Sequence, residues 1–194
     1  DHGDGHDHSD GHDHAHHHGR GDIDPHAWLS VDNASVWLGA IAERLAQVDP
    51  SHAAHYRANA EAGQAQLTAL RAEIAGILAP VGNAGLVMYH DAYGYLARDF
   101  GLNVLGSIAL GDAASPGAAR LSAIRAALEA SGAVCIFPEV NHPDAFVSLA
   151  AEGGTLRIGS PLDPEGVLLE PGPDLYPTLM RTLARTIADC VAGG

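Results

Sequence analysis

Lysine is absent from this sequence, and its ten basic residues, all arginine, are set against 24 acidic residues. With histidine neutral, the formal net charge is −14. This balance argues against nucleic acid or an anionic membrane surface as a partner, and it suits a protein that handles cations. The same acidity could simply keep a protein in solution, so charge alone does not decide between the two interpretations.

Long hydrophobic runs are also missing. No stretch reaches the roughly 18 apolar residues typical of a membrane-spanning helix. No GxSxG, HExxH or phosphate-loop motif occurs, so a hydrolase would have to rely on metal-activated water. No signal peptide opens the chain at Asp1, and we expect a mature, cleaved or trimmed product.

Cysteine is scarce, with two residues, Cys135 and Cys190, and no CxxC pair, so a structural zinc finger is not expected. Cys135 lies in an apolar run that predicts a buried strand, and Cys190 lies near the end of the last predicted helix. A disulfide between them would stabilise the fold by about 4 kcal/mol in the chain-entropy model and would indicate an oxidising compartment. Two buried free thiols are the alternative.

Eight of the thirteen histidines fall in residues 1–22, where they alternate with Asp, Gly and Ser. This composition cannot bury a core and predicts a disordered loop that collects metal weakly. A purely solubilising or tag-like origin is the alternative. The expected weak ligands are His2, His6, His8, His12, His14, His16, His17 and His18.

Two helices are predicted next. The first covers residues 32–48, with Asp32 or Asn33 as the N-cap. The second covers residues 51–78 and would be about 40 Å long, which suits a rigid link between two lobes.

After Pro80 strands and helices alternate, which predicts an α/β domain with a mainly parallel sheet of about four strands. Because the alternation begins only at residue 84, we expect an N-terminal half before Asp1 to be missing. The predicted strands cover 84–88, 103–108, 133–137 and 155–158, and the predicted helices cover 92–100, 116–130, 142–151 and 173–192. The expected divisions are a His/Asp-rich loop at 1–22, the end of an N-terminal lobe at 23–49, a linking helix at 50–79 and a C-terminal α/β lobe at 80–194.

Three residues are the candidate metal ligands. His26 follows Pro25, which stiffens the chain, and therefore stands at a defined corner. His90 and Asp163 each follow a predicted strand, so both should lie at the carboxyl edge of the sheet, where open α/β sheets bind ligands. Two imidazoles and a carboxylate suit zinc, and a further histidine from the missing part would complete the set. Taken singly, His90 could be a hydrogen-bonding residue and Asp163 a turn residue.

Glu139 and His142 follow the predicted strand at 133–137 and should lie near the same edge. We expect Glu139 to orient a ligand or to anchor its loop. His142 is a weaker candidate ligand.

Taken in order, the motifs resemble a known family. A His/Asp-rich loop precedes DPHAWL, and VMYHDAYGYLARDFGL, CIFPEV and GSPLDPEG follow. This combination is similar to the cluster A-I solute-binding proteins of ABC transporters, in their zinc-binding, ZnuA- and AztC-like branch. The resemblance covers nearly the whole chain after residue 22.

The resemblance implies two α/β lobes joined by a long rigid helix, with metal in the cleft between them. It places His26 and His90 on histidine ligands and Asp163 on a carboxylate that ligates metal in some members. Histidine at position 90 favours zinc, because manganese-binding relatives usually carry Glu there. It also implies a disulfide between Cys135 and Cys190, and hence a periplasmic location. The chain departs from the family at Val140-Asn141-His142, where Pro-Gln-Phe or a similar segment is usual.

The leading hypothesis is therefore a periplasmic, monomeric zinc-binding protein that delivers Zn²⁺ to an ABC permease in the inner membrane. Its loop histidines would release metal as the pH falls toward about 5, since imidazoles must be neutral to bind. The second hypothesis is a periplasmic zinc buffer or metallochaperone, and a zinc chaperone is a further partner to expect. The third is a zinc hydrolase. Turnover with a coordinated water would favour the third hypothesis, and dependence of uptake on a permease would separate the first two.

Overall fold

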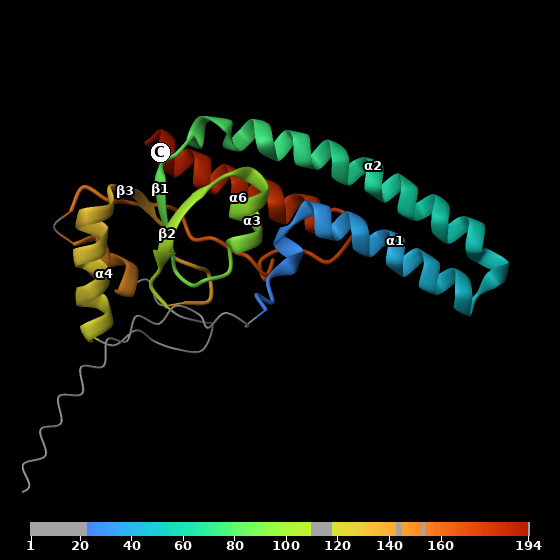
Figure 1. Cartoon of the computed structure of the whole chain (residues 1–194), viewed down its shortest axis with the longest axis horizontal. Coiled ribbons are helices and arrows are strands. Elements are labelled where there is room, and N and C mark those ends of the chain that lie inside the picture. Colours follow the sequence, from blue (N-terminus) through green and yellow to red (C-terminus); the bar gives the residue numbers. More distant parts are fainter. Residues whose placement is uncertain (1–22, 110–117, 143–144, 153, 194) are drawn as a thin grey trace, which may run out of the picture.

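The computed structural model describes residues 23–109, 118–142, 145–152 and 154–193, as an α/β fold (Figure 1). The α-helices are α1 (Val31–Val48), α2 (Ala53–Leu78), α3 (Gly94–Phe100), α4 (Ala118–Ser131), α5 (Ala145–Ala151) and α6 (Leu175–Ala192). Short 3-10 turns are η1 (Ala27–Leu29), η2 (Pro50–His52) and η3 (Ala79–Val81). The strands are β1 (Gly85–Met88), β2 (Asn103–Ser107), β3 (Ala133–Ile136) and β4 (Arg157–Ile158).

The four strands form one sheet in the order β2-β1-β3-β4, and all three pairings are parallel. The predicted parallel four-stranded sheet is confirmed. From β1 the chain adds β2 on one side and later returns to place β3 on the other. The carboxyl ends of β1 and β3 therefore form the switch point at which such sheets bind ligands.

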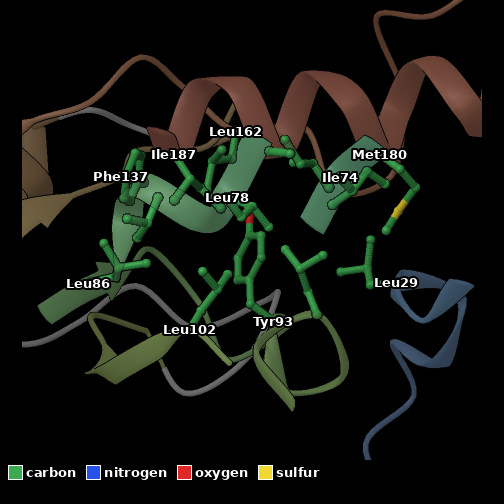
Figure 2. Close-up of a cluster of buried hydrophobic side chains, with 14 of the residues drawn as sticks. Leu29, Ile74, Leu78, Leu86, Tyr93, Leu102, Phe137, Leu162, Met180 and Ile187 are labelled. Carbon is green, nitrogen blue, oxygen red and sulfur yellow. The ribbon is translucent and has the colours of Figure 1, made fainter. Parts of the chain in front are cut away.

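Helices cover both faces of the sheet, as a buried parallel sheet requires. Leu86 and Met88 of β1 point into a core formed with α2, α3 and α6. Val87 and the following Tyr89 point to the opposite face, where they pack with residues of α4 and α5. Figure 2 shows the larger core, in which side chains of α2 and α6 meet Leu86, Tyr93 and Phe137.

The long helix predicted at 51–78 is present as α2, preceded by η2. At 1.5 Å per residue its 26 residues span about 39 Å. α2 packs along α1 and also against α6 (Figure 1). Within the described part of the chain, no helix is long and apolar enough to cross a membrane.

Helix α1 differs from the prediction in two respects. Its N-cap is Ser30, whose hydroxyl accepts the Asn33 N–H at 3.2 Å, so the prediction of Asp32 or Asn33 as the cap was wrong. DPHAWL ends in a 3-10 turn, and the helix starts directly after it, one residue before the expected range. In addition, five of its large apolar side chains are exposed, Val36 among them. The other four are Trp37, Ile41, Leu45 and Val48.

The predicted disulfide is present between Cys135 of β3 and Cys190 of α6, with an S–S distance of 2.08 Å. The alternative of two free thiols was wrong. The bridge fixes the last helix to the strand that leads into Glu139, and therefore to one side of the candidate metal centre.

Candidate metal centre

His26 stands on a chain corner that is held from several directions. The Asp24 carboxylate accepts both the His26 backbone N–H, at 2.9 Å, and the His26 ring Nδ1, at 2.8 Å. Asp24 itself has room because residue 94 is glycine: a Cβ there would lie 3.0 Å from Asp24 Oδ2. These contacts hold the chain at His26 more firmly than Pro25 alone would. Because Nδ1 is bonded to Asp24, the other ring nitrogen, Nε2, points away from Asp24.

Neighbouring residues anchor the same corner to distant parts of the chain. The Trp28 indole N–H donates to the Pro164 carbonyl at 2.9 Å, and the Trp28 carbonyl accepts from the Tyr176 hydroxyl at 3.0 Å. Leu29 is fully buried, and the Ser30 hydroxyl donates to Asp99 at 2.5 Å. These contacts join the His26 corner to α3, to α6 and to the 163–165 segment.

His90 lies two residues beyond β1 and is 97% buried, with a relative exposure of 3%. Its Nδ1 contacts Glu139 Oε2 at 2.5 Å, and the other Glu139 oxygen accepts the Tyr93 hydroxyl at 2.9 Å. Burial, together with the negative charge of Glu139, raises the pKa of Tyr93 well above its ordinary value. Tyr93 therefore stays protonated and keeps donating to Glu139.

The two imidazoles meet through their remaining nitrogens. His26 Nε2 and His90 Nε2 are 3.4 Å apart, with ring centroids at 5.2 Å. Two nitrogens bound to one tetrahedral zinc at 2.0–2.1 Å are separated by about 3.3–3.4 Å. The distance between the two Nε2 atoms therefore matches the distance between two nitrogen ligands of one zinc ion.

Each of these imidazoles has a carboxylate on its Nδ1, Asp24 for His26 and Glu139 for His90. A carboxylate in this position fixes the tautomer that presents Nε2 as the donor and raises the basicity of the ring. The two residues predicted as histidine ligands, His26 and His90, are thus brought together as expected. Glu139 contacts His90 in the orienting position that the sequence suggested.

Asp163 lies at the same edge of the sheet but with a different arrangement. Its two carboxylate oxygens accept the backbone N–H groups of Val167, at 3.0 Å, and Leu168, at 2.9 Å. It also lines a cavity of about 30 Å³ together with His90, Glu139 and His142. The structure brings Asp163 to the site, while its carboxylate also caps the turn that follows it.

A parallel bridge explains why Asp163 and Glu139 lie on the same edge. Glu139 pairs with Leu162 beyond the ends of β3 and β4, and the Leu162 N–H donates to the Pro138 carbonyl at 2.8 Å. This pairing extends the sheet by one step at the edge where the candidate ligands lie. The predicted loop ligands, from His2 to His18, lie outside the described residues.

His142 is nearer to the site than its weak sequence signal indicated. Its ring stacks on Tyr89 with centroids 4.3 Å apart and planes inclined by 20°. Its Nε2 lies 3.7 Å from Glu139 Oε2. The sequence signal for this position was that residues 139 and 142 follow the predicted strand at 133–137.

Comparison with known proteins identifies the family. The family model described as "ZnuA: Zinc-uptake complex component A periplasmic" matches residues 1–190. The chain belongs to the ZnuA family.

A curated relative and two solved structures are similar to this chain. The high-affinity zinc uptake system protein ZnuA of Paracoccus denitrificans is 44% identical over 168 residues, which cover 87% of this chain and 52% of that protein. A crystal structure of ZnuA superimposes with a TM-score of 0.73 at 26% identity, over 87% of this chain and 62% of that one. FpvC of Pseudomonas aeruginosa in complex with Mn²⁺ gives a TM-score of 0.76 at 27% identity, over 87% of this chain and 61% of that one. The chain thus spans about half the length of the Paracoccus relative.

Proposed function

We propose that this chain is the zinc-holding part of the periplasmic binding component of a high-affinity ABC uptake system. The observation that carries the proposal is the pair of carboxylate-oriented imidazoles, His26 and His90, with Nε2 atoms 3.4 Å apart. Zinc, the cargo, would bind between these two nitrogens. Asp163 and a histidine outside this chain are the further ligands that we propose.

The donor atoms support zinc as the cargo. Imidazole nitrogens suit Zn²⁺, Cu²⁺ and Ni²⁺, whereas Mn²⁺ and other hard cations favour carboxylate, carbonyl and water oxygens. The relatives named for zinc uptake agree with this choice. FpvC structures hold Mn²⁺ or Ni²⁺, so metal preference within this fold depends on the ligand set and has to be measured.

The proposed setting is the periplasm, with an inner-membrane ABC permease as the receiving partner. The Cys135–Cys190 disulfide supports an oxidising compartment, and the family description names the periplasm. A periplasmic zinc chaperone is a second partner that we propose. We expect a monomer that binds and releases metal without turnover.

We also propose a division of the chain into four parts. Residues 23–49 would complete an N-terminal lobe, residues 50–79 would link it to the C-terminal lobe at 80–194, and residues 1–22 would collect zinc. Trp37, Ile41 and Val48 support the first assignment, because they line one side of α1 with 42%, 55% and 69% of their surface exposed. Side chains of this kind are typical of an interface that another part of the polypeptide covers.

The test is zinc binding to the intact chain, measured by competition with a chromogenic chelator. His90→Ala should abolish the tightest site, and deletion of residues 1–22 should remove only weaker sites. The matched control is His52→Ala, since His52 is an exposed histidine bonded to Asp49 at 2.7 Å, on η2. The control should leave the tightest site unchanged.

The opposite pattern would contradict the proposal. If the tightest zinc site persists in His90→Ala and disappears with residues 1–22, the protein is a buffer that uses its histidine tract. In that case the sheet-edge residues do not hold the cargo.

A further inference from the structure

His90 offers its two ring nitrogens to two different groups of residues. Nε2 faces His26 at 3.4 Å, and Nδ1 faces Glu139 at 2.5 Å. On the Nδ1 side, Glu139 Oε2 also lies 3.7 Å from His142 Nε2. One ligand atom from each of His90, Glu139 and His142 lies within 4.8 Å of the other two.

The spacing between Glu139 and His142 suits a metal ion. Two ligands at about 2.1 Å from one zinc are about 3.4 Å apart at the tetrahedral angle and farther apart at wider angles, up to about 4.2 Å. The 3.7 Å between Glu139 Oε2 and His142 Nε2 falls in this interval. The 2.5 Å between His90 Nδ1 and Glu139 Oε2 is a hydrogen-bond distance, and it has to lengthen by about 1 Å for both atoms to bind one ion. Two nitrogens and a carboxylate oxygen are an established zinc donor set.

The surroundings also have the character of a built site. Glu139 is 97% buried, with 3% exposure, and Tyr93 holds its other oxygen at 2.9 Å. Stacking on Tyr89 orients the His142 ring, whose side chain is 21% exposed. The cavity beside these residues measures about 30 Å³, which exceeds the roughly 10–15 Å³ that one water needs.

We propose that His90 Nδ1, Glu139 and His142 form a second zinc position, which holds the cargo as it enters or leaves the His26–His90 position. This inference rests on the proposed function. It goes beyond that function because it assigns metal binding to His142 and to the opposite side of the His90 ring.

The two positions exclude each other at His90. A neutral imidazole carries one N–H and one donor lone pair. Zinc on Nε2 therefore requires the proton on Nδ1, where it bonds to Glu139. Zinc on Nδ1 requires that same proton on Nε2, so moving the ion relocates one proton across the ring without net gain or loss. The second position needs no ligand from the His26 corner, and all three of its ligands follow β1 and β3.

The experiment follows each imidazole during a zinc titration of the full chain. Long-range ¹H–¹⁵N spectra resolve every histidine side chain, including the eight in residues 1–22, and distinguish metal-bound from protonated nitrogens. In the unaltered chain, the Nε2 signals of His26 and His90 should become metal-bound. In His26→Ala, where the first position is lost, His90 Nδ1 and His142 Nε2 should become metal-bound instead.

A second variant isolates His142. His142→Phe keeps a ring on Tyr89 but removes the ligand nitrogens, and in the His26→Ala background it should lower zinc affinity at this site at least about tenfold, the lower bound for loss of even an orienting residue. The exposed His52→Ala serves as the matched control and should leave these signals unchanged.

Two results would overturn the inference, and they are distinguishable. If His26 and His90 become metal-bound while the His142 nitrogens never shift, in the unaltered chain or in His26→Ala, the second position does not exist and the proposed function stands. If neither His26 nor His90 responds to zinc in the unaltered chain, both proposals are wrong.

Discussion

At the scale of single residues, the candidate centre is defined by the carboxylates behind the histidines as much as by the histidines. Asp24 and Glu139 each contact an Nδ1, at 2.8 and 2.5 Å, and this leaves both Nε2 atoms directed at one point. Without these contacts each ring could rotate and present either nitrogen. The orientation of the His90 ring is thus set by a polar contact with Glu139, a residue far from it in the sequence.

The residue that tests this view most sharply is Glu139. We expect Glu139→Gln to lower zinc affinity by about 10–100-fold, because the neutral amide neither fixes the His90 tautomer nor raises its basicity as a carboxylate does. Chelator competition measures the affinity, and circular dichroism checks that the fold is kept. Glu170→Gln, at an exposed position, is the control. Unchanged affinity in a folded Glu139→Gln protein would show that Glu139 has no orienting role.

Asp163 and His142 mark the limit of residue-level prediction. The sequence placed Asp163 after a strand, but it could not show that the carboxylate caps the amides of residues 167 and 168. Nor could it show that His142 approaches Glu139, because that contact depends on the turn geometry and on stacking with Tyr89. By contrast, His26 and His90 were predictable, since a Pro corner and a strand end are local features.

At the scale of elements, the corner between α1 and α2 depends on Asp49. Its carboxylate accepts bonds from Ser51, at 2.5 Å, and Tyr56, at 2.9 Å, and also contacts His52. These hydrogen bonds lower the pKa of Asp49 below its ordinary value of 3.8, and the bond from Ser51 has the largest effect. A lowered pKa in the folded state means that the associated stability is present above the unfolded value and is lost as the pH falls through the folded value.

Asp49→Asn should therefore lower the melting temperature at neutral pH, and the difference from the unaltered protein should disappear as the pH falls below 3.8 and through the lowered pKa of Asp49. Thermal unfolding over this pH range measures both. Glu61→Gln, at an exposed position in the middle of α2, is the control. A difference that is the same at all pH values would mean that the Asn side chain changes the corner for reasons other than charge.

The disulfide joins two further elements, β3 and α6. Its cysteines are 55 residues apart, so the chain-entropy model predicts that Cys135→Ala with Cys190→Ala lowers the free energy of unfolding by about 4 kcal/mol. Urea unfolding of the double variant and of the unaltered protein, each with and without a thiol reductant, measures the loss. The reductant should destabilise only the unaltered protein. Equal stability of the oxidised and fully reduced proteins would contradict this account.

The elements themselves were largely predictable. Strand-and-helix alternation after Pro80 located all four strands, because buried apolar runs bounded by Gly and polar residues are a local signal. The helix at 32–48 was found as well, but not its N-cap. Its apolar residues recur at helical spacing, yet Ile41 and Val48 are 55% and 69% exposed here. Periodicity shows that a side of a helix is apolar and does not show what covers it.

At the scale of the whole molecule, the fold brings distant segments to one edge of the sheet. His26 precedes α1, whereas His90 and Glu139 follow β1 and β3. The α1–α2 hairpin leaves this edge and returns to the sheet along α6, so the His26 corner is held against the same lobe as His90 (Figure 1). This fold therefore brings together His26 and His90, which are 64 positions apart in the sequence, and the packing of the helices keeps their two imidazoles close to each other.

The most direct test of the central claim is the location of zinc in crystals of the intact chain, by anomalous scattering at the zinc absorption edge. The account predicts a peak between His26 Nε2 and His90 Nε2, about 2.0–2.1 Å from each nitrogen. The account would be contradicted if the tightest site were fully occupied by zinc at another place and neither of these two nitrogens bound metal.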